Sequence, residues 1–64
     1  MNKRFAKNLK KEMIEAEVSR VDLANDTGIS LSSIHKYCTG ERKPSWSQLQ
    51  KIKNSLGCDI GKLA

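Results

Sequence analysis

Hydrophobic residues recur at helical spacing near the start of the chain. Phe5, Leu9 and Met13 follow one another every four residues, and Ile14 continues the series, while Lys and Glu fill the other face. This periodicity predicts a helix over residues 2–16 with its apolar side toward a core.

The second predicted helix covers residues 20–27 and has a signal at each end. Ser19 and Asp22 have the spacing of a capping box, here with Asp in the role usually taken by Glu or Gln. Gly28 is expected to end the helix, because glycine readily takes the left-handed conformation at a helix end. The residues expected to face inward are Leu23 and Ala24.

The third predicted helix covers residues 31–39. Ser30 supplies the N-terminal cap and Gly40 the C-terminal stop, and Ile29 is the apolar residue of the turn that precedes the helix. Its expected inner face consists of Ile34, Tyr37 and Cys38.

A fourth helix is predicted after the loop at 41–44. Ser45 and Gln48 have the spacing of a second capping box, and Gly57 ends the segment. The expected inner face consists of Leu49, Ile52 and Leu56. Asp59 is placed to cap a last turn that holds Ile60 and Leu63. The chain is therefore predicted to be all-α, with five short helices in one domain over residues 1–64.

The length and the cysteines narrow the class of protein. A chain of 64 residues buries only about 60% of the surface that its unfolded form exposes, so the core is expected to be thin. We see no secretory signal and no apolar run of membrane-spanning length. We therefore expect a reduced, cytoplasmic protein in which Cys38 and Cys58 are free thiols.

The positive charge is concentrated toward the two ends of the sequence. The net charge is +5; residues 1–20 carry six Lys/Arg against three Glu, and residues 41–64 carry five against two acidic residues. Basic flanks around a nearly neutral centre suit a protein that binds phosphates at its margins. Ordinary solubility charge explains the net value equally well.

Residues 20–38 have the pattern of a helix-turn-helix. Two helices that cross steeply need a small residue where their backbones approach, supplied by Ala24, and a turn residue with positive φ, supplied by Gly28. Branched apolar residues hold the angle between such helices. These are Leu23, Ile29 and Ile34.

Together with the sequence that follows it, this motif resembles the Cro and lambda-repressor-like family of phage and bacterial regulators. The resemblance covers about residues 5–63, and its downstream part consists of Gly40 to Pro44, Leu49, Ile52, Leu56-Gly57 and Leu63. It implies a compact five-helix fold that binds double-stranded DNA, as a weak homodimer or a dimer formed on DNA. It further implies a repressor in the cytoplasm of a bacterium or phage-infected cell.

The resemblance also implies roles for individual residues. The helix at 31–39 would lie in the major groove, with its N-terminal residues at base edges. The positions that match base-reading residues are Leu31, Ser32 and Lys36. The positions expected near the sugar-phosphate backbone are Arg20, Ser30, Ser33, His35, Arg42 and Lys43.

Three departures from the family pattern stand out. Glu17 occupies a place where the family often has glycine, so the chain is expected to turn differently there. Met13 and Cys38 stand where many members bury an Arg–Glu ion pair, and an apolar pair there is compatible with the fold. Leu31 replaces a polar residue often used for base reading, which leaves the preferred DNA sequence open.

Metal, cofactor and catalytic sites are not predicted. His35 and Cys38 are spaced as a ligand pair, but structural zinc needs four ligands and Cys58 is the only further thiol. We interpret Cys38 as a core residue and Cys58 as half-buried packing. Neither a nucleophile with a His partner, nor a phosphate loop, nor a believable carboxylate pair is present, so no enzyme is expected.

Two interpretations are open for the aromatic residues Tyr37 and Trp46, and two for the basic N-terminal segment. Tyr37 and Trp46 are expected to pack in the core and not to serve as stacking platforms for single strands. Trp46 with Ile60 and Leu63 is our candidate dimer contact, although Ile60 and Leu63 could equally cap the monomer. The lysines and Arg4 before residue 12 form either a solvated face or a further phosphate contact.

A second class of function stays open. The same fold can serve as a protein-interaction module, such as an antitoxin or an adaptor. A DNA-reading helix keeps a polar and basic surface, whereas a protein-docking face is apolar, and residues 31–36 are mixed with the polar interpretation ahead. RNA binding is less favoured because exposed aromatic residues are scarce.

Overall fold

The computed structural model describes residues 2–63, which form helices joined by short turns. The helices are α1 (Asn2–Ala16), α2 (Arg20–Thr27), α3 (Leu31–Thr39), α4 (Trp46–Leu56) and α5 (Ile60–Leu63). The all-α, five-helix fold predicted from the periodicity is therefore confirmed, and the first three helices have the predicted bounds. No helix within residues 2–63 combines the length and the apolar character needed to cross a membrane.

The predicted serine caps at α2 and α3 are present. Ser19 Oγ accepts a hydrogen bond from the Asp22 N–H at 3.1 Å, and the Asp22 carboxylate accepts one from the Ser19 N–H at 3.4 Å, which completes the capping box. Ser30 Oγ accepts from the Ser33 N–H at 3.2 Å. Local side-chain chemistry thus sets where both helices of the motif begin.

The predicted capping box at α4 is only half formed. Ser45 Oγ accepts from the Gln48 N–H at 3.3 Å. The Gln48 side chain does not reach back to Ser45 but accepts a hydrogen bond from the Tyr37 hydroxyl. A buried tyrosine needs a partner for its O–H, and Gln48 supplies it while joining α4 to α3.

The first helix ends in the left-handed turn that glycine usually occupies, although no glycine is there. Glu17 has φ +57°, and the Glu17 and Val18 N–H groups donate to the carbonyls of Ile14 and Met13 at 3.1 and 3.0 Å. These two bonds are those of a Schellman C-cap. The turn therefore keeps the geometry that glycine favours, at the steric cost of a Cβ.

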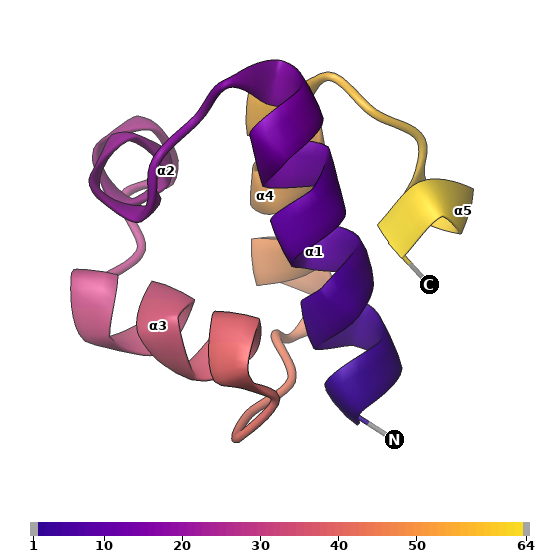
Figure 1. Cartoon of the computed structure of the whole chain (residues 1–64). Coiled ribbons are helices and arrows are strands. Elements are labelled where there is room, and N and C mark those ends of the chain that lie inside the picture. Colours follow the sequence, from indigo (N-terminus) through magenta and orange to yellow (C-terminus); the bar gives the residue numbers. More distant parts are fainter. Residues whose placement is uncertain (1, 64) are drawn as a thin grey trace.

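The core lies between α1, α3, α4 and α5. In Figure 1, α1 crosses in front of α4, with α3 and α5 on either side, and α2 lies above α3 and packs against both α3 and α4. Side chains from all five helices and from the turn before α3 fill the interior: Phe5, Leu9, Met13, Leu23, Ile29, Ile34, Tyr37, Cys38, Ile52 and Leu63. The half-buried residues around them include Ala24, Leu49, Leu56 and Cys58.

One assignment on α1 is wrong in detail. Ile14 is 76% exposed, whereas Glu12 is 7% exposed. Each residue turns a helix by roughly 100°, so Ile14 points about 180° away from Phe5 and Glu12 lies within about 20° of it. The inner face of α1 is thus Phe5, Leu9 and Met13 with Glu12 among them, and Ile14 is on the outside.

Trp46 also departs from its expected place, since its side chain is 65% exposed and does not pack in the core. It is the first residue of α4 and lies about 120° around the helix from Ile52, the fully buried residue of that face. Tyr37, the other aromatic residue expected in the core, is fully buried.

Candidate nucleic-acid interface

The third helix has two sharply different faces. Ile34, Tyr37 and Cys38 point into the core and are no more than 1% exposed. On the opposite face the side chains are exposed to solvent, and Leu31 is 48% exposed. The exposed residues of this outer face are Leu31, Ser32, His35, Lys36 and Thr39. The structure therefore gathers all three predicted base-reading residues on one surface.

The start of α3 carries a pair of hydroxyls. Ser30 Oγ lies 3.0 Å from Ser33 Oγ, to which it donates, and it also accepts from the Ser33 backbone. Ser30 is exposed and Ser33 is half-buried. These hydroxyls lie at the N-terminus of the helix, whose dipole favours anions.

The loop after α3 is tied to the end of the helix. The Lys36 carbonyl accepts from the N–H groups of Gly40, of Glu41 at 3.0 Å and of Arg42 at 3.3 Å. Pro44 is buried, so the far end of the loop is also anchored. The exposed Arg42 and Lys43 side chains thus project from a loop whose backbone is held against α3.

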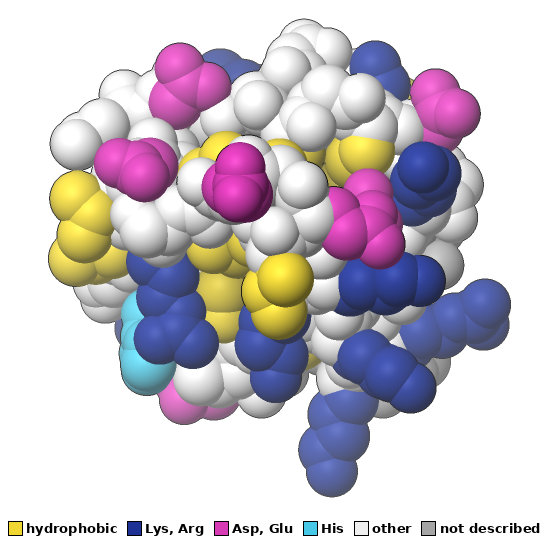
Figure 2. All heavy atoms as spheres, turned by 45° about the horizontal axis from the view of Figure 1, so that its top comes forward, with side chains coloured by type: hydrophobic (Ala, Val, Ile, Leu, Met, Phe, Trp, Pro, Cys, Tyr) yellow, Lys and Arg dark blue, Asp and Glu magenta, His cyan; other side chains and the backbone are white. Residues whose placement is uncertain are grey.

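The N-terminal end of α1 adjoins the same region. A Cβ placed on Gly40, which has φ +84°, would lie 3.5 Å from the backbone of Lys3. Lys3 and Arg4 are exposed. Lys3 and Arg4 at the start of α1 therefore lie near the end of α3, and Figure 2 shows Lys and Arg side chains crowded on one side of the molecule.

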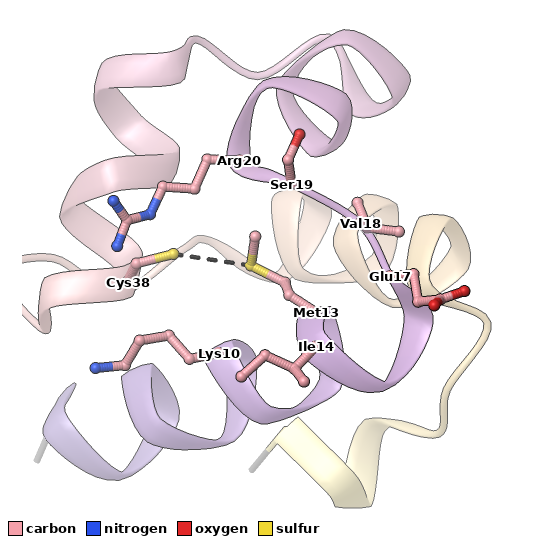
Figure 3. Close-up of a pocket in the computed structure, with 8 residues that line it drawn as sticks. All are labelled: Lys10, Met13, Ile14, Glu17, Val18, Ser19, Arg20 and Cys38. Carbon is pink, nitrogen blue, oxygen red and sulfur yellow. Dashed lines mark hydrogen bonds between the residues drawn. The ribbon is translucent and has the colours of Figure 1, made fainter.

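Arg20 is exposed and begins α2. Its side chain extends toward Cys38 of α3, and Lys10 of α1 extends in the same direction beneath it (Figure 3). The exposed Arg20 guanidinium is therefore a cationic donor available to an anion on this side of α3.

One residue of this surface was missed from the sequence. Val21 is 53% exposed and, with Leu31, Gly28 and Ser30, lines a shallow hollow of about 390 Å³ beside the turn of the motif. The available signal was its position on α2, two residues before Leu23 and so on a different side of the helix from that inner residue.

The two thiols differ in their surroundings. Cys38 Sγ lies 3.8 Å from Met13 Sδ, so the predicted apolar pair between α1 and α3 is formed. Cys58 is half-buried, and this burial is the main cause that raises the pKa of its thiol. Within residues 2–63, His, Cys, Asp and Glu side chains do not gather in threes that could hold a metal ion.

A known protein family matches most of the chain. The family described as "Cro/C1-type HTH DNA-binding domain" matches residues 8–64. Neither a curated protein nor a solved structure matches the chain.

Proposed function

The chain belongs to the Cro/C1-type helix-turn-helix DNA-binding family, and we propose that it represses transcription by binding a specific operator in double-stranded DNA. The observation that carries this proposal is the exposed outer face of α3, with Ser32, His35 and Lys36 beside the basic loop at 42–43. A helix presented in this way enters the major groove of DNA.

Three side chains on α3 are assigned to base reading. Lys36 donates to O6 and N7 of guanine, which is the commonest kind of specific contact. Leu31 contacts the methyl group of thymine, consistent with its half-exposed apolar side chain. Ser32 pairs with either a donor or an acceptor and therefore contributes little discrimination.

Contacts to the DNA backbone supply register and much of the affinity. Arg20 at the start of α2 and the Arg42–Lys43 pair after α3 are exposed cations on either side of the reading helix in the sequence. The full proposed set of backbone contacts is Arg20, Ser30, Ser33, His35, Arg42 and Lys43.

Two copies are proposed to bind neighbouring half-sites, about 34 Å apart, and to block access of polymerase. Trp46 offers an exposed aromatic contact for the second copy, since it is 65% exposed at the start of α4. Leu63 is fully buried and caps the core, so it is not available for this contact. The dimer contact is therefore centred on Trp46.

The decisive experiment is selection of bound sequences from a pool of random DNA duplexes. We expect a near-palindromic site with half-sites one helical turn apart, and an affinity that falls with salt by about 0.9 log units per log unit for each phosphate neutralised. Trp46→Ser should leave binding to a single half-site intact and abolish cooperative filling of two. Recovery of no preferred sequence, or a flat salt response, would overturn the proposal.

One observation favours a second candidate function, protein docking. Val21 and Leu31 are both about half exposed and adjoin the same hollow on the face that would meet DNA. If that surface binds a partner protein, Leu31→Ser should abolish the complex with that partner. The selection from random DNA duplexes should then enrich no sequence. The larger number of polar residues on α3 favours DNA.

A further inference from the structure

An apolar groove lies where α1 and the turn after it meet α2 and α3. Met13 and Cys38 form its floor, where their sulfur atoms lie 3.8 Å apart. Ile14 and Val18 line it as well, and Ile14 is exposed to solvent over most of its surface. Figure 2 shows hydrophobic side chains at the bottom of a hollow between Lys and Arg side chains.

The charged residues of this groove are not evenly distributed. Figure 3 shows the Lys10 and Arg20 side chains extending in the same direction on either side of the Cys38–Met13 pair, while the Glu17 carboxylate lies at the opposite end and points away. The groove is thus basic at one end and apolar along its floor.

We propose that this groove binds a small organic anion with an apolar tail. Its acidic head lies between Lys10 and Arg20, and its tail packs on Ile14 and Val18 above the floor of the groove. The groove volume of about 430 Å³ falls within the range of small-molecule sites, which combine apolar walls with a few charged groups. A neutral or cationic molecule with the same tail gains no electrostatic attraction from Lys10 and Arg20.

The site links ligand binding to DNA binding through Arg20. This step rests on the proposed function, in which Arg20 contacts a DNA phosphate. An anion held by Arg20 removes that contact and lowers the affinity for DNA, and DNA lowers the affinity for the anion by the same factor. The groove would therefore serve as an inducer site.

Octanoate is a suitable probe, with octanol and octylammonium as matched molecules of the same tail length. Titration of the 64-residue chain without DNA, followed by amide NMR, should give saturable shifts at Met13, Ile14, Val18 and Cys38. Octanol and octylammonium should bind at least about threefold more weakly, because each forgoes the pairing with Lys10 and Arg20.

Pairs of variants test whether octanoate binds in the groove or elsewhere on the surface. Ile14→Ser and Lys10→Gln should each weaken octanoate about fivefold, by removing tail contact and head-group charge respectively. Their matched controls are Val21→Ser, an exposed apolar residue outside the groove, and Lys11→Gln, the neighbouring exposed lysine. The controls should bind octanoate as the parent protein does.

Absence of saturable shifts would overturn the proposal, as would shifts that Ile14→Ser and Lys10→Gln leave unchanged. Groove shifts that grow with protein concentration in the absence of probe would instead identify a second copy as the occupant, and would also overturn it.

The coupling is tested separately on duplex DNA. Saturating octanoate, but not octanol, should weaken DNA binding about fivefold, and Arg20→Gln should remove this effect. Octanoate binding with unchanged DNA affinity would overturn the inducer role. The NMR titration contains no DNA, so it tests octanoate binding in the groove even if the protein does not bind DNA.

Discussion

The two faces of α3 serve different purposes within nine residues. The inner face holds Ile34, Tyr37 and Cys38 in the core, and the Tyr37 hydroxyl is satisfied by Gln48 of α4. The outer face presents Ser32 and Lys36 to solvent. Helical periodicity makes this division possible, because residues three or four apart share a face.

The comparison teaches that stability and recognition are separable here. A side chain on the inner face contributes to the free energy of folding through burial, whereas one on the outer face contributes almost nothing to it. Substitutions on the two faces should therefore affect different measurements.

The largest effect is expected on the inner face. Ile34→Ala should lower the free energy of unfolding by about 2–4 kcal/mol, because Ile34 is fully buried and a thin core cannot refill the cavity. Urea denaturation measures this loss. Ser32→Ala, on the outer face, is the control and should stay within about 0.5 kcal/mol of the parent protein. Equal stability of the two variants would erase the distinction between the faces.

The next effect is on DNA recognition at the outer face. Lys36→Ala should cost about 1–3 kcal/mol in affinity for the selected site and relax the preference at one base pair, with unchanged stability. Competition binding against a panel of single-base variants measures this.

Arg42→Ala is the matched comparison for Lys36→Ala. It should weaken binding to all sequences alike and reduce the salt slope by about 0.9. If Lys36→Ala behaves in the same way, Lys36 contacts phosphate and not a base.

A smaller effect is expected at the end of α1, which lies outside both faces. Glu17→Gly should raise the free energy of unfolding by about 1 kcal/mol, because glycine adopts the observed φ of +57° without a Cβ clash. Glu15→Gly, within the helix, should lower it by about 1 kcal/mol. Thermal unfolding compares the two, and the same sign for both would refute the strain at Glu17.

The smallest effect concerns the two thiols, Cys38 on the inner face of α3 and Cys58 between α4 and α5. Burial raises the pKa of Cys58, so at pH 8 the native protein has less thiolate at this site than the unfolded chain. Cys58 should then react more slowly in the native protein, by less than about tenfold, and faster as the pH rises.

Cys38 is 1% exposed on the inner face of α3 and should react only when the core opens. Peptide mapping after timed alkylation distinguishes the two thiols. Equal rates at Cys38 and Cys58 in the native protein would contradict the packing described for α3. For Cys58, the protonated thiol is the form that folding favours, so its contribution to stability is lost as the pH rises through its raised pKa.

Much of the fold was predictable because its signals are local. Ser19, Ser30 and Ser45 each bond to an N–H three residues ahead, and such a contact needs no information about the rest of the chain. Gly28, Gly40 and Gly57 end helices through their own backbone freedom. Helix bounds, and hence the exposed face of α3, followed from these residues.

The errors arose where two interpretations of one periodicity competed. Ile14 and Met13 are adjacent and both apolar, but Ile14 lies about 180° around α1 from Phe5, so Met13 belongs to the inner face and Ile14 does not. Glu12 is charged and was assigned to the solvent face, yet it lies between inward-facing turns of α1. Trp46 is expected in the core, but its angular position on α4 turns it away from Ile52.

The sequence by itself determined five helices, their ends and the surface of α3 proposed to read DNA, because caps, stops and periodicity act within a few residues. The tertiary structure alone decided that Met13 pairs with Cys38 and that Lys10 and Arg20 flank one groove. Those relations join residues 10 to 25 positions apart. They depend on how α1, α2 and α3 cross, and no local signal specifies this.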